Sequence, residues 1–199
     1  MSAKDFARSV IKRRMPEFSD WSAHIWELGE TAWREYQSAA FYVDLLRKEG
    51  FEVETGSAGM PTAFCATWSN GDGPTIGGYA EYDGIPGNCQ AATPHKAPRD
   101  GLSEHAGGHT DPHSALGVSA LAGFLATKAA MQEHNIPGKL KFFGADISKF
   151  LQFHWWQRVL YKTDTANFPS NTYEGLGRFV GVATHIDRKS TRLNSSHPK

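Results

Sequence analysis

The hydrophobic pattern changes at Gly50 from a helical to an alternating period, and this change limits the possible folds more than any other feature. Before Gly50, apolar side chains recur at helical spacing. The pattern predicts one helix ending before Pro16, a second starting near Ser19 or Asp20, and a third over residues 31–49. After Gly50, β-forming residues predict strands over residues 51–55, 62–68 and 75–82. Helices and strands in one chain of this length indicate the α/β class.

A turn and a long loop connect the later elements. Residues 69–73, Ser-Asn-Gly-Asp-Gly, have the composition of a hairpin turn, so we expect the strands over 62–68 and 75–82 to pair with each other. Residues 84–108 have no periodicity, and a loop this long in a compact domain is usually functional or disordered. A helix is then predicted over 114–134, with Thr110 or Asp111 as its cap, followed by a strand over 139–143.

Composition narrows the class of protein. Lys plus Arg and Asp plus Glu both number 21, so nothing suggests a nucleic-acid partner. No apolar run approaches the roughly 18 to 20 residues of a membrane span, and the N-terminal residues lack the apolar segment of a secretory signal. The two cysteines form no metal-binding or disulfide pattern. We therefore expect a cytoplasmic protein with no membrane partner.

Five side chains with metal-binding chemistry flank the long loop. Glu81 and Asp83 lie at the end of a predicted strand, where α/β sheets place ligand sites, and as residues i and i+2 they share a face. His109, Asp111 and His113 lie where the next helix begins. Histidine and carboxylate are common ligands of zinc and similar ions. The loop could fold both groups into one metal site.

The start of the helix affects these histidines differently. The positive end of the helix dipole disfavours a cation but favours the neutral imidazole that binds metal. His109, just before the helix, is therefore the better candidate ligand, and His113 could simply line the first turn. Simpler roles remain open as well: Asp111 as a helix cap, and Glu81 with Asp83 as a solvated acidic pair.

Residues 15–144 resemble the N-terminal half of the M20 metallopeptidase and amidohydrolase family, in particular its aminobenzoyl-glutamate hydrolase-like branch. Order and spacing agree over about two thirds of the chain. The matching segments are residues 26–31 (WELGET), 45–53 (LLRKEGFEV), 59–64 (GMPTAF), 78–87 (GYAEYDGIPG), 105–109 (HAGGH) and 139–144 (KLKFFG).

The resemblance implies a dinuclear hydrolase that cleaves an amide bond of an N-acyl amino acid or small dipeptide. Its metal would be Zn²⁺, or alternatively Mn²⁺; a metal-bound hydroxide would attack the carbonyl with a Glu as general base. His109 matches a metal-ligand histidine, while Glu81 and Asp83 match the acidic motif beside the metals as supporting groups. The resemblance also implies a small-molecule substrate and a parent protein that is a homo- or hetero-oligomer.

The sequence departs from the family at two places. Gly107 stands where related enzymes commonly carry Cys, so we expect Asp111 or His113 to substitute as a ligand. After Gly144, residues 145–149 (ADISK) replace the family's Pro-x-Glu-Glu segment, which supplies the general base. We therefore expect no retained catalytic base and an inactive chain.

These departures predict three parts. Residues 1–144 would form the truncated N-terminal portion of a zinc-peptidase-like catalytic domain, with a mixed sheet and flanking helices. Residues 145–186 are unassigned, and could be chimeric or out of frame. Residues 187–199 resemble the translation of a sequencing adapter, so we expect an artefactual, disordered tail.

Two other functions fit parts of the pattern. The His109-x-Asp111 spacing is also found in non-haem iron oxygenases, although that motif usually lies on a β-rich barrel. A non-catalytic binding module could keep the fold without the reaction, and need not hold a stoichiometric metal ion.

Overall fold

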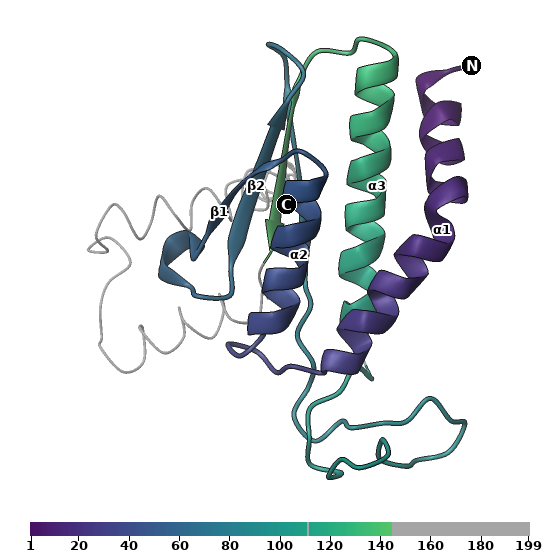
Figure 1. The fold of residues 1–199 in the computed structure, drawn as a ribbon, viewed down its shortest axis with the longest axis vertical. Coiled ribbons are helices and arrows are strands. Elements are labelled where there is room, and N and C mark those ends of the chain that lie inside the picture. The colour runs from purple at the N-terminus through teal and green to yellow at the C-terminus, as the bar shows by residue number, and fades with distance from the viewer. Residues whose placement is uncertain (111, 145–199) are drawn as a thin grey trace, which may run out of the picture.

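A computed structural model describes residues 1–110 and 112–144 (Figure 1). The expectations for residues 145–186, for the tail 187–199 and for Asp111 lie outside the described residues. The α/β class, with a mixed sheet and flanking helices, is confirmed.

One long helix replaces the two that the sequence predicts before residue 29. Helix α1 spans Ala3–Leu28, with the Ser2 hydroxyl capping the backbone N–H of Asp5 at 3.2 Å. The predicted break before Pro16 is wrong, because Pro16 lies inside the helix. A proline removes one helical hydrogen bond and kinks a helix without always ending it, and Figure 1 shows α1 bending along its length. The burial of the α1 face that carries Phe18 and Ile25 offsets that cost.

Helix α2 spans Tyr36–Lys48 and begins later than the predicted residue 31. Glu30 supplies its N-terminal cap, because its carboxylate accepts hydrogen bonds from the backbone N–H of Ser38 (2.8 Å) and of Gln37 (3.1 Å). Thr31 instead forms a parallel β-bridge with Gly84. The segment before α2 therefore serves as a connection to the candidate site.

Four strands form one mixed sheet in the order β1-β2-β4-β3. Strand β2 is antiparallel to both β1 and β4, whereas β3 is parallel to β4. A short 3₁₀ turn at Ser57–Gly59 lies between β1 and β2. The bounds are Glu52–Thr55 for β1, Phe64–Ser69 for β2, Thr75–Ala80 for β3 and Lys139–Gly144 for β4.

The predicted hairpin between β2 and β3 is wrong, because β4 lies between them. The turn over residues 69–74 instead encloses the start of β4. Asn70 donates its backbone N–H to the Gly138 carbonyl (2.8 Å), and Lys139 donates to the Pro74 carbonyl (2.9 Å). The composition of this segment does produce a turn, but it cannot show that a distant strand enters the gap.

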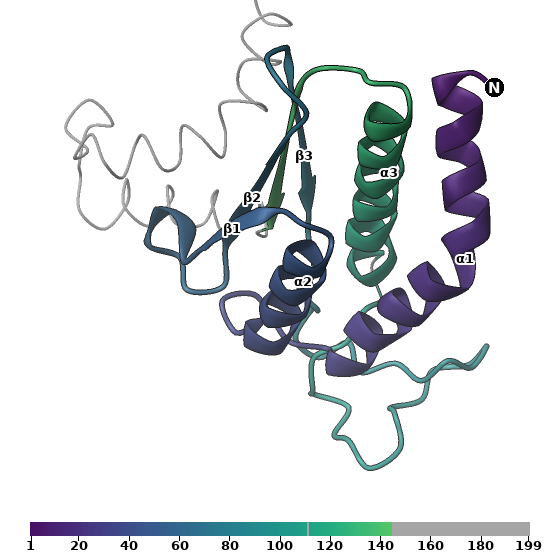
Figure 2. The ribbon, with the colours of Figure 1, turned by 45° about the horizontal axis from the view of Figure 1, so that its top comes forward.

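Helix α3 spans His113–Glu133 and lies between the sheet and α1 (Figures 1 and 2). Pro112 occupies its N-cap position without a side-chain cap, so Thr110 is not the cap that the sequence suggests. By length and composition α3 could cross a membrane, and half of its apolar window is buried within the protein.

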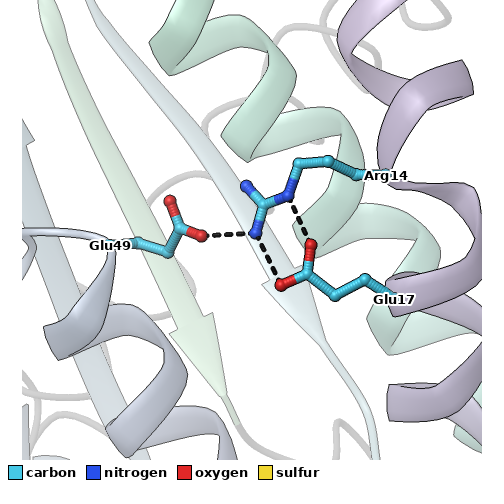
Figure 3. A network of polar contacts seen from close by, with 3 residues as sticks. All are labelled: Arg14, Glu17 and Glu49. Atoms are coloured by element: carbon cyan, nitrogen blue, oxygen red, sulfur yellow. Dashed lines mark hydrogen bonds and ion pairs between the residues drawn. The ribbon is translucent and has the colours of Figure 1, made fainter.

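An ionic network joins α1 to the end of α2 (Figure 3). Arg14 donates from Nε and Nη2 to both carboxylate oxygens of Glu17 (2.7 and 3.1 Å), and its Nη2 also donates to Glu49. Its guanidinium also lies over the rings of Phe18 and Trp21, 5.2 and 5.5 Å from their centres. The hydrogen bond to Glu17, and then that to Glu49, raise the pKa of Arg14 above its ordinary value despite partial burial.

Two glycines of α3 give a matched test of the packing between α3 and the end of β3. A methyl group at Gly117 would overlap the Glu81 carbonyl oxygen and lie 2.6 Å from the Tyr42 hydroxyl, whereas one at Gly123 would meet nothing within 4 Å. We expect Gly117→Ala to lower the free energy of unfolding by about 1–3 kcal/mol. Gly123→Ala should raise it by about 0.5–1 kcal/mol, because alanine favours helix. Urea unfolding measures both, and equal effects would contradict the described packing.

Tyr42 should make the chain sensitive to alkaline pH. Its side chain is fully buried, and its hydroxyl has no hydrogen-bond partner among residues 1–110 and 112–144. Burial raises the pKa of Tyr42 above its ordinary value of 10.0, because the phenolate is disfavoured there. Above about pH 10, Tyr42 ionises in the unfolded chain but not in the folded chain. Ionisation stabilises the unfolded state, so the free energy of unfolding falls as pH rises.

We expect Tyr42→Phe to keep or raise the free energy of unfolding at pH 7, by up to about 1 kcal/mol, since no described hydrogen bond is lost. The variant should also lose less stability than the parent chain between about pH 9 and 11. Thermal unfolding across this range measures both effects. A variant that loses stability as steeply as the parent would show that Tyr42 does not cause the alkaline sensitivity.

Candidate active site

The acidic pair lies directly beyond the end of β3. The ladder between β3 and β4 reaches Ala80, which pairs with Gly144, and the chain continues in extended form through Glu81, Tyr82 and Asp83. The Tyr82 side chain is fully buried, while Glu81 and Asp83 are 7% and 6% exposed. The two carboxylates therefore do not form the solvated pair that the sequence leaves open.

The long loop returns to the point where it begins. Gly84 donates its backbone N–H to the Glu30 carbonyl (2.6 Å). Ile85 and Gly108 then exchange two backbone hydrogen bonds, of 2.9 and 3.2 Å, as an antiparallel bridge. These bonds bring the segment that carries His109 back to the end of β3.

Crowded backbone explains the glycines at this junction. A Cβ atom at Gly107 would overlap the Gly29 carbonyl oxygen and lie 2.8 Å from Cγ2 of Thr31. One at Gly84 would lie 3.2 Å from the carbonyl oxygens of both Gly29 and Gly108. A cysteine at position 107, which the family resemblance leads us to expect, therefore does not fit this backbone without a shift of the segment at Gly29.

His113, the first residue of α3, contacts both carboxylates. Its Nε2 lies 2.6 Å from Oε2 of Glu81, and its Nδ1 lies 2.9 Å from Oδ1 of Asp83. The imidazole is about 20% exposed and each carboxylate side chain about 9%, so the cluster is largely shielded from solvent. The strand end and the start of the helix are therefore two sides of one polar cluster.

His113, which the sequence places second to His109 as a candidate ligand, touches both acids. His109 is buried at 8% exposure. The helix dipole argument considers only the two histidines and omits the two carboxylates that face His113.

The metal-binding prediction concerns His109, Asp111 and His113. Within residues 1–110 and 112–144, no group of three or more His, Cys, Asp or Glu is arranged so that it could hold a metal ion. Both ring nitrogens of His113 face carboxylates in this structure, and Asp111 lies outside the described residues, so the described residues hold only part of the predicted ligand set. The ligand assignments stay predictions.

The cluster has the chemistry of a proton-handling site. An imidazole between two carboxylates can hold a proton at either ring nitrogen, and each carboxylate fixes the ring orientation through the atom that it contacts. The surrounding fold, a mixed sheet with helices, differs from the β-rich barrel on which the iron-binding alternative usually lies.

Sequence reasoning missed residues that position this site. Arg99 holds the long loop against α1 by donating to the carbonyls of Trp26 (3.2 Å) and Glu27 (2.8 Å), with its guanidinium 4.5 Å from the Trp26 ring centre. Glu35, predicted to lie within a helix, is instead fully buried and accepts a hydrogen bond from Thr62. Neither residue carries a local sequence signal, because both act through distant partners.

Comparison with known proteins gives one sequence relative. No family model matches the chain. Over 139 residues it is 29% identical to a curated protein of Escherichia coli (strain K12), a subunit of p-aminobenzoyl-glutamate hydrolase, and the match covers 70% of this chain. The chain spans only 28% of that relative's length.

Two solved structures share the fold. A putative aminohydrolase from methicillin-resistant Staphylococcus aureus matches 71% of this chain and 34% of its own, with a TM-score of 0.54 and 18% identity. The YXEP protein of Bacillus subtilis, described as a dinuclear metal-binding peptidase from the M20 family, matches 67% of this chain and 35% of its own, with a TM-score of 0.53 and 19% identity. The chain is therefore similar in sequence to a hydrolase subunit and shares its fold with these two solved structures.

Proposed function

We propose that the chain carries the N-terminal part of the catalytic domain of a metal-dependent M20-type amidohydrolase. Its substrate would be an N-acyl amino acid or small dipeptide of the aminobenzoyl-glutamate kind. The observation that carries the proposal is the meeting of Glu81 and Asp83 with His113. This cluster lies in residues that also share the fold of an M20 peptidase.

The proposed metal ligands are His109, Asp111 and His113, with Glu81 and Asp83 as supporting groups. Their donor chemistry supports Zn²⁺, or alternatively Mn²⁺, and the Bacillus subtilis structure is described as dinuclear. A divalent ion would lower the pKa of its bound water and polarise the substrate carbonyl. The two carboxylates contact the His113 ring, and one of them would hold a proton on one ring nitrogen while the other nitrogen faces the ion.

The wider setting of the protein is also a proposal. The Escherichia coli relative is named as a subunit, which supports an oligomeric parent protein. Cys89 is a buried free thiol, which is compatible with the reducing cytoplasm.

We expect the 199-residue chain alone to show no measurable hydrolysis of p-aminobenzoyl-glutamate or another N-acyl amino acid, with Zn²⁺ or Mn²⁺ added. Residues 145–149 (ADISK) supply no glutamate pair for the general base. An assay of released amino acid checks this, and turnover would contradict it. A reading frame of the source DNA that restores a Pro-x-Glu-Glu segment after Gly144 should yield an active enzyme; an inactive product would contradict the proposed reaction.

Metal binding by the chain tests the ligand assignment directly. We expect stoichiometric uptake of Zn²⁺, and at least roughly a tenfold loss of affinity when Asp111 and His113 are both replaced by alanine, because two ligands are removed. Titration calorimetry and elemental analysis measure the affinity and the metal content.

His105→Ala is the matched control. This loop histidine is largely exposed, and its described ion pair is with Glu104. Unchanged metal content in the double variant would show that Asp111 and His113 are not the ligands. Equal losses in the control would point to non-specific binding.

A further inference from the structure

Tyr82 lies between the two carboxylates in the sequence, but its side chain points into the core. Successive side chains of an extended segment point to opposite sides, so Glu81 and Asp83 share the side that faces His113. The Tyr82 ring is fully buried and stacks on Phe64, with 6.1 Å between ring centres and 8° between ring planes. It also packs against Tyr42 at 5.2 Å. The residue that separates the acids is thus held on the opposite side of the chain.

A buried hydrogen-bond chain holds the far end of this side chain. The Tyr82 hydroxyl donates to the backbone carbonyl of Thr62. The Thr62 hydroxyl in turn donates to Oε2 of Glu35 at 2.9 Å. Thr62 is 1% exposed and Glu35 is fully buried, so these bonds lie where water does not compete. These two hydrogen bonds join the segment before α2, the segment before β2 and the end of β3.

This anchor acts at the point where the sheet passes into the loop. On one side, the ladder to β4 fixes Ala80. On the other side, Gly84 is fixed by its bond to the Glu30 carbonyl. Between them, a rotation of the backbone at residue 82 would swing both neighbouring carboxylates away from His113 together. The packing of the Tyr82 ring resists its displacement from the core. The hydroxyl restricts the ring to the position in which it reaches the Thr62 carbonyl, because a buried hydroxyl without a hydrogen bond would cost free energy.

We propose that Tyr82 is a positioning residue: its hydroxyl, held through Thr62 and Glu35, sets the place at which Glu81 and Asp83 meet His113. The relevance of this placement to hydrolysis rests on the proposed function. The placement itself does not, because it concerns contacts within the chain.

The test uses the full chain without metal or substrate. Nuclear magnetic resonance of the ¹⁵N-labelled chain reports how fast the His113 ring N–H exchanges with water, a rate that the carboxylate contacts slow. We expect Tyr82→Phe, which keeps the ring and its stacking, to speed this exchange at least roughly tenfold, because the carboxylates lose their fixed position. Tyr79→Phe is the matched control, since Tyr79 lies on β3 and is 47% exposed; it should leave the rate unchanged.

A loss of stability in Tyr82→Phe with an unchanged His113 exchange rate would overturn the proposal, because it would show that the hydroxyl only stabilises the core. If Tyr82→Phe does not fold, Thr62→Val takes its place. It removes the bond to Glu35 but keeps the carbonyl that accepts from Tyr82, so we expect exchange faster than in the parent chain. Thr62→Ser restores the hydroxyl and should restore the slow rate. Parent-like exchange in Thr62→Val would equally overturn the proposal.

The test of Tyr82 and the test of the proposed function can fail independently. Failure of the chain to take up Zn²⁺ would remove the support for a metal-dependent hydrolase and leave the Tyr82 result standing. Unchanged His113 exchange would remove the role of Tyr82 and leave metal uptake standing.

Discussion

The close approach of α3 to the end of β3 is the contact on which the candidate site depends. Gly117 lets the helix backbone rest against the Glu81 carbonyl, and this depth of packing brings His113, one turn earlier, to the two carboxylates. The helix is held in place from its other side by α1, as Figure 2 shows. A polar cluster with little exposure is thereby formed between an apolar helix and a strand end, where its ionic contacts are weakly screened.

The hydrophobic pattern of the sequence is sufficient to predict the helices and strands whose bounds depend on nearby residues. The strand at residues 139–144 and the helix at 113–133 follow from periodicity, and each begins and ends within two residues of its predicted bounds. The acidic pair is found because it follows a strand, and the histidine because it opens a helix. The resemblance to a known family adds the expected order of these segments, and the chain shares its fold with the Bacillus subtilis protein.

Features set by distant partners could not be predicted from the sequence. Nothing within residues 62–82 indicates that β4 enters between β2 and β3, since β4 begins only at Lys139. The helix continues through Pro16 because the apolar face on both sides of it is buried, a fact that appears only in the tertiary structure. Glu35 looks like an ordinary surface carboxylate, and its burial becomes understandable only beside Thr62.

The crowding at Gly107 also limits which substitutions the site can accept during evolution. The Cβ of a cysteine at this position would overlap the Gly29 carbonyl, so the chain cannot accept that side chain by one substitution without moving the turn after α1. Gly29 itself has a left-handed backbone (φ 54°), which further restricts how the turn can yield. The two segments are therefore expected to vary as a pair, so that the identity of one residue determines which replacements are tolerated at the other.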